Sequence, residues 1–488
     1  MNDTDHPTPD RTVHDVVVIG AGAVGENAAD RASRGGLSVV IVDNALVGGE
    51  CSYWACMPSK ALLRPGAVLA AARAVPGAAR AVTGGIDVAA TLARRDEFTS
   101  HWDDHGQVAW LDGAGIALRR GQARFTGPRE LVVRDATGDE TTLVARHAVI
   151  VATGSVPLLP DVPGLVEAGC WTSRDATSVR AVPDSLVILG GGVVAVEMAV
   201  AYADLGAAVT VLVRGDRLLP RAEPFVSTEL AASLAGLGID VRYRTSATSV
   251  HRDTDGVHLT LEDGTYVVAA QVLAATGRAP RTAELGLDVL GLTPGDPLTV
   301  DDALQVAGVA GGWLFACGDV TGRTATTHQG KYDARVAGDV VSARFSGVLA
   351  ERERESTAPE WSRYRASADH GAVPQVVFAR PEAAWVGLTE RAARDRGLDV
   401  RVVQYAIGSV AGASVAADGY TGTAQLVLDD ARGLVVGATF TGPDAAELLH
   451  AATVAVVGQV PLDRLWHAVP AYPTVSEVWL RLLETAGL

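Results

Sequence analysis

The chain has 488 residues, of which 48% are apolar, and it carries a formal net charge of -16 with a pI near 5.1. This length is too great for one hydrophobic core and predicts three or four domains. The acidic balance excludes a nucleic-acid-binding surface, because neutralising phosphates needs clustered positive charge. No apolar run reaches the roughly 18 residues that a membrane helix requires, so we expect no membrane partner.

The first 12 residues, MNDTDHPTPDRT, are polar and lack the apolar centre of a signal peptide. We therefore expect a disordered start and a cytoplasmic location. Four cysteines are too few for a secreted disulfide framework in a chain this long. In a reducing compartment a close pair such as Cys51 and Cys56 is more often catalytic or metal-binding than structural. Zinc is the weaker of these two interpretations because no second close pair supplies ligands, and we predict no metal site.

A dinucleotide-binding unit is predicted at the start of the chain. The apolar run VHDVVVIG (13–20) has the pattern of a buried parallel strand, and a helix-like stretch and a second strand ending at Asp43 follow it. Between the first strand and the helix lie the glycines of a G-x-G-x-x-G pattern: Gly20, Gly22 and Gly25. Such glycines let the backbone approach a pyrophosphate at the helix N-terminus, and Asp43 can bind a ribose hydroxyl.

The same pattern returns near residue 190, where the strand SLVILG leads into Gly190 and Gly192, then a helix and another strand. In this copy no acidic residue ends the second strand, and Arg214 stands there. A carboxylate at this point favours NAD and repels a 2′-phosphate, whereas an arginine favours NADP. We therefore predict NADPH as the electron donor, with NADH as the alternative. The competing explanation is that Arg214 is simply a solvated surface residue.

Further strands end in short glycine motifs. The strand at 147–155 contains Thr153 and Gly154, the run VLAATGRAP contains Gly277, and WLFACGDVTG contains Asp319. Residues 345–372 are charged and lack a strand pattern, which predicts a linker. Beyond residue 373 alternating runs predict an antiparallel sheet with helices, a separate α+β domain.

Taken in this order, the motifs resemble those of the pyridine nucleotide-disulfide oxidoreductases, the flavoprotein family of dihydrolipoyl dehydrogenase, glutathione reductase and mercuric reductase. The resemblance covers nearly the whole chain. It rests on the first glycine pattern, on GGECSYWACMPSK (48–60), on the second glycine pattern, on ATGR (275–278), on Cys-Gly-Asp (317–319) and on VPQVVFARPEAAWVGLTE. It implies an α/β fold with two Rossmann-like nucleotide-binding domains, for FAD and NAD(P), and a C-terminal α+β dimerisation domain.

The resemblance also implies an order of domains along the chain. The expected segments are a first part of the FAD-binding domain (13–155), the NAD(P)-binding domain (156–276), a second part of the FAD-binding domain (277–344), the charged linker (345–372) and the dimerisation domain (373–488).

In this family the two cysteines form a redox-active disulfide against the flavin. Carried over, Cys51 is the interchange thiol that meets substrate, and Cys56 is the flavin-facing thiolate. Lys60 falls at the lysine that contacts the flavin, paired with Glu197. Electrons would pass from the nicotinamide to the flavin and then to the disulfide. The residues expected to bind FAD and NADPH are Gly20, Gly22, Gly25, Asp43, Gly49, Thr153, Gly154, Gly190, Gly192, Arg214, Gly277 and Asp319.

The chain departs from the family pattern near its C-terminus. The disulfide reductases carry His-Pro-Thr-x-Ser-Glu, in which the histidine shuttles a proton to the interchange cysteine and the glutamate orients it. Here Tyr472 replaces the histidine, and Glu477 is retained. Histidine has a reference pKa near 6.5 and tyrosine near 10, so an ordinary tyrosine is only about 0.1% ionised at pH 7. Tyrosine is a poor general base that still donates a hydrogen bond. His467 is an alternative base, and an aromatic side chain filling space at the interface is an alternative role for Tyr472.

The expected protein is a homodimeric FAD enzyme that passes electrons from NADPH through a Cys51–Cys56 disulfide to a small-molecule disulfide or a similar acceptor. Quinone reduction and mercuric-like metal-ion reduction are alternatives. Mercuric reductase is similar in having tyrosine at the position of Tyr472, but it also uses a C-terminal cysteine pair, whereas this sequence ends LLETAGL. A flavin-binding interaction protein with slow turnover is the alternative from another class.

Overall fold

The computed structural model describes residues 10–347 and 358–488. The chain divides into two compact units: unit 1 comprises residues 1–56, 99–156 and 278–369, and unit 2 comprises residues 57–98, 157–277 and 370–488. Residues 1–9 of the start expected to be disordered lie outside the described residues, whereas residues 10–12 already belong to the first strand. The domain boundaries expected from the sequence stay predictions.

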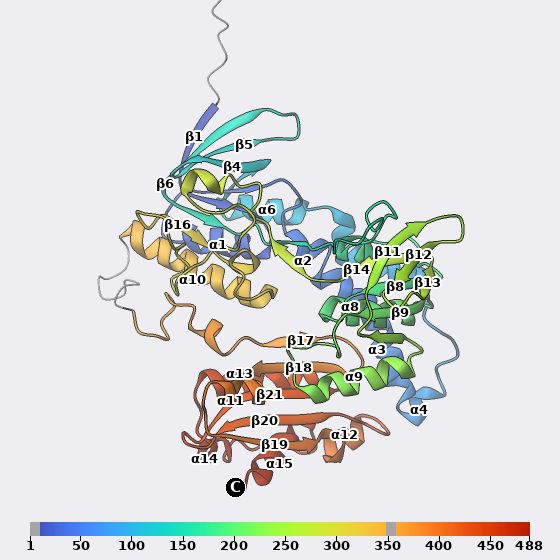
Figure 1. The fold of residues 1–488 in the computed structure, drawn as a ribbon. Helices are drawn as coiled ribbons and strands as arrows, with labels where there is room; N and C mark the ends of the chain where they lie inside the picture. The colour runs from blue at the N-terminus through green and yellow to red at the C-terminus, as the bar shows by residue number, and fades with distance from the viewer. Residues whose placement is uncertain (1–9, 348–357) are drawn as a thin grey trace, which may run out of the picture. The chain divides into compact units, whose positions relative to one another are not determined.

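Unit 1 is built on a seven-stranded sheet in the order β3-β2-β1-β6-β5-β4, with β16 also paired to β6 (Figure 1). The strands are β1 (Asp10–Ile19), β2 (Val39–Asp43), β3 (Ala117–Arg120), β4 (Gln122–Gly127), β5 (Glu130–Arg134), β6 (Glu140–Val151) and β16 (Leu314–Ala316). β1 pairs in parallel with both β2 and β6. Its Val16, Val17 and Val18 are fully buried, which is why the apolar run shows no alternation.

The helices of unit 1 are α1 (Ala23–Ser33), α2 (Gly49–Tyr53), α6 (His105–Gly113) and α10 (Thr327–Ser346), with 3₁₀ turns η1 (Ser100–Trp102), η2 (Leu287–Leu290), η3 (Gly318–Thr321) and η6 (Ser367–His370). α10 packs closely on α1 through Gly338, where a Cβ atom would lie 2.9 Å from the Ala28 carbonyl oxygen. A short pair joins β7 (Ser155–Pro157) to β15 (Arg278–Pro280).

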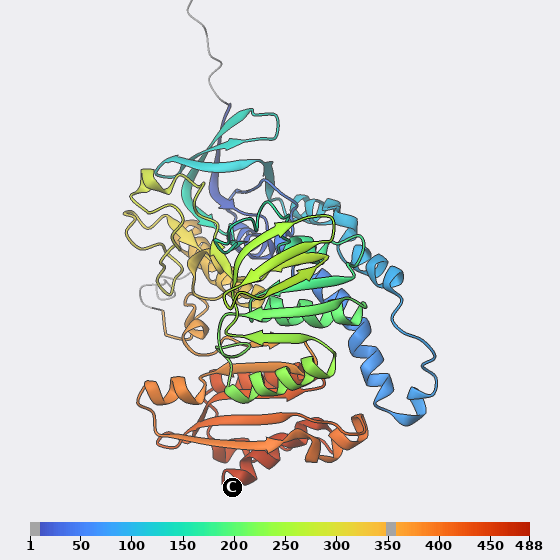
Figure 2. The same ribbon diagram turned by 45° about the vertical axis from the view of Figure 1, so that its right-hand side comes forward.

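The first half of unit 2 carries a parallel sheet in the order β10-β9-β8-β14 and an antiparallel sheet in the order β11-β12-β13 (Figure 2). The strands are β8 (Ser185–Leu189), β9 (Ala208–Val213), β10 (Asp240–Tyr243), β11 (Ala247–Arg252), β12 (Val257–Leu261), β13 (Tyr266–Ala269) and β14 (Gln271–Ala274). The helices are α3 (Cys56–Arg73), α4 (Pro76–Ala79), α5 (Val88–Phe98), α7 (Ser173–Thr177), α8 (Val193–Asp204) and α9 (Pro224–Gly236).

The C-terminal part of unit 2 is an antiparallel sheet with helices, as the alternating sequence pattern predicted. Its strand order is β17-β18-β21-β20-β19. The elements are β17 (Gln375–Val377), β18 (Glu382–Gly387), α11 (Glu390–Asp395), β19 (Val400–Ala406), η7 (Ile407–Ser409), α12 (Ala411–Ala416), β20 (Thr423–Asp429), β21 (Leu434–Gly442), η8 (Ala445–Leu448), α13 (Leu449–Val457), α14 (Leu462–Leu465), η9 (Val475–Glu477) and α15 (Val478–Thr485).

Helix α9 lies beside this C-terminal sheet in both ribbon views (Figures 1 and 2). Glu229 accepts hydrogen bonds from the hydroxyls of Thr423, at 2.6 Å, and of Thr441, at 2.5 Å. Glu223, just before the helix, accepts from the Gln425 amide at 2.8 Å. Through these hydrogen bonds, the two carboxylates fix the position of α9 on the C-terminal sheet.

Part of the segment expected to be a charged linker packs into the core of unit 1. Residues 348–357 lie outside the described residues. After them, Tyr364 and Ala366 are buried in the core of unit 1, and Arg365 forms an ion pair with Asp302 at 2.8 Å. The sequence does not indicate these buried residues, because they are few and lie among charged ones.

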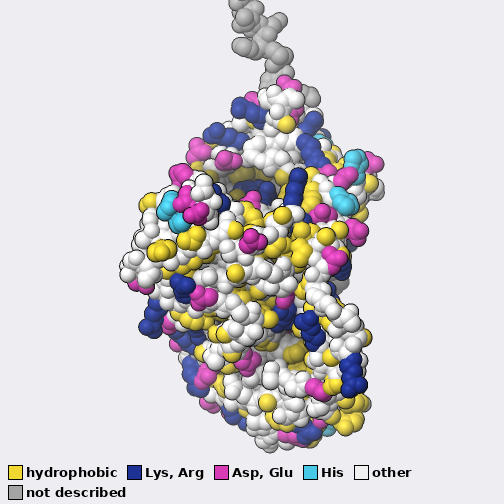
Figure 3. All heavy atoms as spheres, turned by 90° about the vertical axis from the view of Figure 1, so that its right-hand side faces the viewer, with side chains coloured by type: hydrophobic (Ala, Val, Ile, Leu, Met, Phe, Trp, Pro, Cys, Tyr) yellow, Lys and Arg dark blue, Asp and Glu magenta, His cyan; other side chains and the backbone are white. Residues whose placement is uncertain are grey.

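Acidic and basic side chains are interspersed over the face drawn in Figure 3, and the described basic side chains on that face form no continuous patch. Among the described helices, none combines the length and the apolar character that crossing a membrane requires.

Candidate functional site

The turn between β1 and α1 in unit 1 is shaped by glycines. Gly20 has a φ of +103°, and a Cβ atom there would lie 2.4 Å from the Ala152 carbonyl oxygen. A Cβ atom on Gly25 would lie 1.8 Å from the Gly20 carbonyl oxygen. Gly22 caps α1, and Gly49 approaches it so closely that a Cβ atom on Gly49 would lie 2.7 Å from the Gly22 Cα atom. The helix N-terminus therefore faces a backbone cradle free of side chains, which suits a pyrophosphate.

A pocket opens beside this turn, at the carboxyl ends of the parallel strands. Its lining comprises Ile19, Gly20, Val42, Asp43, Asn44, Gly121, Gln122, Ala123, Thr153, Arg281, Glu284 and Leu285. The Asp43 carboxylate accepts hydrogen bonds from the amides of Ala21, at 2.6 Å, and Ala45, at 2.7 Å. Each carboxylate oxygen can accept another hydrogen bond, so Asp43 is suited to a ribose hydroxyl. Sequence position alone placed Asp43 and Thr153 here, and the structure brings them to one pocket.

A second polar cluster in unit 1 is centred on Asp319. Its carboxylate accepts from the Ser155 hydroxyl at 2.6 Å, and the Arg278 guanidinium donates to the same hydroxyl at 2.7 Å. Gly154, adjacent to Ser155, has a φ of +70°. Before α10, the hydroxyls of Thr324 and Thr326 are buried without a hydrogen-bond partner among the described residues. Buried hydroxyls normally form hydrogen bonds, so these two hydroxyls are suited to bind the polar groups of a ligand.

The two cysteines of the opening motif lie on successive helices: Cys51 within α2 and Cys56 at the first residue of α3. Both are half-buried free thiols that hydrogen-bond to each other, and the Cys56 sulfur lies 3.1 Å from the Thr327 hydroxyl. The hydrogen bond to Cys56, together with burial, raises the pKa of Cys51. Cys56 stands at the N-terminus of α3, and a helix N-terminus stabilises a negative charge.

Two residues in unit 1 had no role assigned from the sequence. Burial raises the pKa of Glu26, in the first turn of α1, to about 7, and the charge of Lys331 acts against this shift. Lys331 also acts on Cys51, lowering its pKa against the larger effects of the Cys56 hydrogen bond and burial. A cation near the thiols is therefore supplied by α10. The rarity of lysine, two among 41 basic residues, was the only available sequence signal.

Unit 2 contains a second glycine cradle. Gly190 has a φ of +127°, and a Cβ atom there would lie 2.3 Å from the Ala275 carbonyl oxygen. Gly192 caps α8 with open space around it, and Gly277 adopts a φ of +132°. Arg214 is exposed directly after β9. The cradle fits a second dinucleotide, with an exposed guanidinium after the second strand.

An ion pair in unit 2 joins Lys60 to the buried Glu197 at 2.8 Å. The Glu197 side chain is 4% exposed, and its other oxygen accepts from the Phe378 amide at 3.0 Å. The Lys60 ammonium lies 4.9 Å from the centre of the Phe378 ring, and its side chain stays 37% exposed. Glu197 and Phe378 thus fix the ammonium while leaving donors available.

The C-terminal motif of unit 2 has one exposed and one buried end. The Tyr472 residue is 77% exposed, and His467 is exposed as well. Glu477 is buried and pairs with Arg481 at 2.8 Å through one oxygen, whereas its other oxygen has no hydrogen-bond partner among the described residues. Within unit 2 these residues do not meet the lysine–glutamate pair, and their roles stay predictions.

Comparison with known proteins adds independent information. A family model described as pyridine nucleotide-disulphide oxidoreductase matches residues 14–334, and one described as the dimerisation domain of that family matches residues 373–482. A dihydrolipoyl dehydrogenase of Halobacterium salinarum is 31% identical over 483 residues, which cover 97% of this chain and 96% of that protein. A mercuric reductase of Staphylococcus aureus is 29% identical over 476 residues, which cover 95% of this chain and 81% of that protein.

Solved structures share the fold. The Cu(II) complex of the HOCl-induced flavoprotein disulfide reductase RclA from Escherichia coli has a TM-score of 0.82 at 24% identity, and the alignment covers 97% of this chain and 99% of that one. LpdA from Mycobacterium tuberculosis has a TM-score of 0.79, also at 24% identity, and here too the alignment covers 97% of this chain and 99% of that one.

The glycine cradle, the pocket at Asp43 and the buried hydroxyls before α10 fit FAD, and the second cradle fits a nicotinamide dinucleotide. The first family model alone matches more than half of the chain. The protein belongs to the pyridine nucleotide-disulfide oxidoreductases, flavoenzymes that use FAD and take electrons from NAD(P)H.

Proposed function

We propose that this enzyme passes electrons from NADPH to a small-molecule disulfide through the thiols of Cys51 and Cys56. The observation that carries the proposal is the hydrogen-bonded thiol pair, with Cys56 at a helix N-terminus and the Lys331 charge nearby. FAD, when bound, supplies the electron transfer between the nicotinamide and this pair. All other steps rest on side chains of the chain.

The thiol chemistry balances without a further reagent. The Cys51 sulfur, once deprotonated, attacks one sulfur of the acceptor, forming a mixed disulfide and releasing one thiol of the acceptor. The Cys56 thiolate then attacks the Cys51 sulfur, which closes the Cys51–Cys56 disulfide and releases the second thiol. Two electrons leave the cysteine pair, and the two protons of its thiols end on the two thiols of the reduced acceptor.

Arg214 supports NADPH over NADH. Its guanidinium is exposed after β9, where a 2′-phosphate would come if the second cradle binds its dinucleotide in the usual way. An arginine binds phosphate through two parallel hydrogen bonds, and no carboxylate at this position repels the phosphate. The Lys60–Glu197 pair, in turn, supplies a fixed ammonium for the cofactor's ring system.

The tyrosine at position 472 affects which acceptor the enzyme can reduce. Dihydrolipoyl dehydrogenase activity needs a base that removes a proton from a thiol near neutral pH, and a tyrosine hydroxyl is poorly suited to this. We propose that lipoamide is a slow substrate for this enzyme. Reduction of a quinone or of mercuric ion is a second candidate, favoured by the replacement of the base itself and by the similarity to mercuric reductases.

Exposed apolar side chains on and after the helices α13 and α14 of the C-terminal part support a homodimer. Val454 is 54% exposed, Val469 84% and Trp466 39%, and all three lie in the part of the chain that the dimerisation-domain model matches. Covering such side chains with a second copy removes apolar surface from water. Sedimentation velocity is expected to show a dimer of about 101 kDa from the 50.4 kDa chain.

An anaerobic acceptor screen tests the proposal. The FAD-loaded enzyme is reduced with NADPH and mixed separately with lipoamide, glutathione disulfide, a naphthoquinone and mercuric ion, while the flavin absorption and the free thiols are followed. Loss of two thiols per chain on mixing with a disulfide supports the proposal. Flavin reoxidation by the quinone alone, with both thiols retained, contradicts it and favours the quinone alternative. Cys51→Ser is the matched control, since it removes transfer to disulfides and leaves direct transfer from the flavin.

A further inference from the structure

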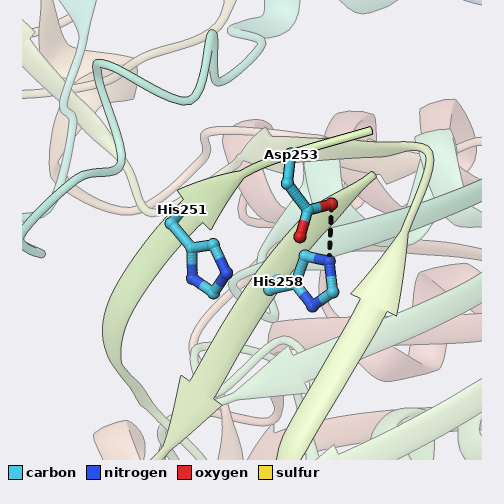
Figure 4. A group of neighbouring side chains, drawn as sticks. All are labelled: His251, Asp253 and His258. Carbon is cyan, nitrogen blue, oxygen red and sulfur yellow. Dashed lines mark hydrogen bonds and ion pairs between the residues drawn. The ribbon is translucent and has the colours of Figure 1, made fainter. Parts of the chain in front are cut away.

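A histidine pair stands on the antiparallel sheet of unit 2, outside every motif discussed above. His251 on β11 lies directly opposite His258 on β12 in the strand register. Asp253 begins the turn that joins these strands, and its backbone amide donates to the Gly256 carbonyl at 3.0 Å. Figure 4 shows the three side chains on the same side of the hairpin, with the two rings side by side.

Strand alternation separates this group from the core. The residues between and beside it, Val250, Val257 and Leu259, are buried in an apolar cluster. Arg252, between His251 and Asp253, is held away from the rings because its guanidinium donates to the Ala168 carbonyl at 2.7 Å and to the Gln271 amide oxygen at 2.7 Å. These hydrogen bonds fix the direction of the guanidinium of Arg252, the arginine adjacent in sequence to His251 and Asp253.

The three side chains lie close enough together to bind one metal ion after small rotations. The ring centres are 4.7 Å apart with an angle of 11° between the planes, and a ring nitrogen of His258 lies 2.9 Å from an Asp253 oxygen. One ligand atom from each of the three residues lies within 4.8 Å of the others. Zinc holds nitrogen and oxygen ligands at about 2.0–2.2 Å, which places tetrahedral ligand atoms about 3.3–3.6 Å apart. Exposed side chains at a hairpin reach that spacing by rotation about χ1 and χ2.

The charge around the group also suits a cation. The backbone amide of Asp255 donates a hydrogen bond to the Asp253 carboxylate at 2.8 Å and so holds this carboxylate at the turn. The acidic residues of this turn are Asp253, whose carboxylate lies 2.9 Å from a ring nitrogen of His258, and Asp255, two residues further on. The two stacked imidazoles offer one ring nitrogen each, and a single metal ion can bind both.

We propose that His251, Asp253 and His258 form a binding site for a late first-row divalent metal ion, with Zn²⁺ as the reference ion. Two imidazole nitrogens and one carboxylate oxygen suit Zn²⁺, Cu²⁺ and Ni²⁺ and discriminate against Mg²⁺ and Ca²⁺, which prefer oxygen ligands. Three protein ligands leave a fourth position of a tetrahedral ion to water. Bound metal would join β11 to β12 across the hairpin. This site is independent of the proposed redox function.

The test is a Zn²⁺ titration of tag-free, FAD-loaded enzyme with its cysteine pair oxidised, so that no thiolate competes for the ion. Calorimetry is expected to show one ion bound per chain. The double variant His251→Gln, His258→Gln is expected to weaken binding at least about tenfold, and Asp253→Asn is expected to weaken it less, because the amide still accepts the turn's hydrogen bonds.

His105→Gln is the matched control. His105 also bonds an aspartate, with its ring nitrogen 2.7 Å from Asp103, but it belongs to no group of three metal-binding side chains among the described residues. Its titration is expected to equal that of the unmodified enzyme.

A second readout guards against misfolding. In EDTA the double variant is expected to keep the flavin absorption and unfolding temperature of the unmodified enzyme, since neither histidine belongs to the core. Zn²⁺ is then expected to raise the unfolding temperature of the unmodified enzyme alone. Equal Zn²⁺ affinity in the unmodified enzyme and a correctly folded double variant would overturn the proposal.

Discussion

In the reaction proposed above, the proton of Cys51 determines how readily the thiol pair attacks an acceptor. A hydrogen bond to Cys56 and burial both raise the pKa of Cys51 and so favour the protonated thiol. The hydroxyl of Thr327 and the charge of Lys331 act in the opposite direction and lower this pKa. Lys331, to which the sequence pattern assigned no role, therefore acts against the hydrogen bond and the burial that raise the pKa of Cys51. Its effect is electrostatic, so it acts without touching a substrate.

Lys331→Met is expected to raise the pKa of Cys51 further and to slow disulfide reduction at pH 7 several-fold, because less of the reactive thiolate is present. The pH profile of the acceptor half-reaction, measured by stopped flow, should move to higher pH. Lys331→Arg keeps the positive charge and should retain most of the profile. An unchanged profile in Lys331→Met would show that the charge has no influence on the thiols.

Tyr472→His tests the missing base. Proton transfer by a positioned histidine contributes about 10²–10⁴-fold in enzymes, so lipoamide reduction near pH 7 is expected to rise by about 10²-fold or more. Reduction of the enzyme by NADPH should be unaffected. Tyr472→Phe, which removes only the hydroxyl, separates the hydrogen-bonding role from simple bulk. If Tyr472→His gains nothing, the acceptor does not meet this residue.

Arg214→Leu tests donor preference. Loss of a hydrogen bond to a charged phosphate costs about 1.5–3 kcal/mol, so kcat/KM for NADPH is expected to fall by about 10–100-fold. The value for NADH should change little, since NADH has no 2′-phosphate. Steady-state kinetics with both donors and a fixed acceptor check this. Equal losses for both donors would mean that Arg214 supports the fold and does not select the cofactor.

At the scale of elements, the two glycine cradles illustrate what local sequence can predict. The turn between β1 and α1 brings backbone within contact distance of backbone at Gly20 and Gly25, so the glycine spacing, together with the strands and the helix around it, predicts this turn. The histidine pair illustrates the opposite case. His251 and His258 meet only through the register of β11 with β12, and their spacing along the chain does not indicate which residues of the hairpin face each other.

Gly25→Ala tests the first cradle. The new Cβ atom would lie 1.8 Å from the Gly20 carbonyl oxygen, so the turn must open and α1 must move away from its anion-binding position. The variant is expected to lose FAD during purification, which the ratio of flavin to protein absorption measures. Gly113→Ala in α6 has nothing within 4 Å of the added atom and should keep its flavin. Full flavin content in Gly25→Ala would show that the turn tolerates a side chain.

At the scale of the whole molecule, buried carboxyl groups make stability depend on pH. Burial raises the pKa of Asp333 to about 8, helped by the neighbouring charge of Asp369, and burial raises the pKa of Glu26 to about 7. Unfolded, both groups ionise near pH 4, so the native state holds more protons from about pH 4 to pH 8. Stability due to these groups is therefore present below pH 4 and falls as pH rises through the folded pKa values.

Urea unfolding of the FAD-loaded enzyme at pH 5.5 and pH 8 is expected to show lower stability at the higher pH. Asp333→Asn removes one of these titrations and should reduce the difference by at least about 1 kcal/mol. Asp369, by contrast, is paired with Arg323 at 3.3 Å and bonded by Gln329 at 2.6 Å, so it forms part of a satisfied network. An unaltered pH dependence in Asp333→Asn would place the titrating groups elsewhere.

The order of apolar runs predicted several domains, whose boundaries stay predictions, and it did not indicate which single residues are buried in a core. Tyr364 and Ala366 are buried within a segment whose charge predicted a linker. Burial of isolated residues depends on contacts with distant parts of the chain, such as the ion pair of Asp302 with Arg365. A periodic pattern of apolar residues along the sequence does not predict such contacts.

The ion pair of Lys60 with Glu197 allows cofactor binding to be followed by chemical modification of lysine. Lys60 and Lys331 are the only side-chain amines in the chain, and both belong to the proposed redox machinery. An amine-directed acylating reagent therefore modifies this protein almost nowhere else, apart from the N-terminus. Mass spectrometry of two peptides would then follow cofactor binding directly, because an ammonium engaged by Glu197 and covered by a bound ring is shielded from acylation.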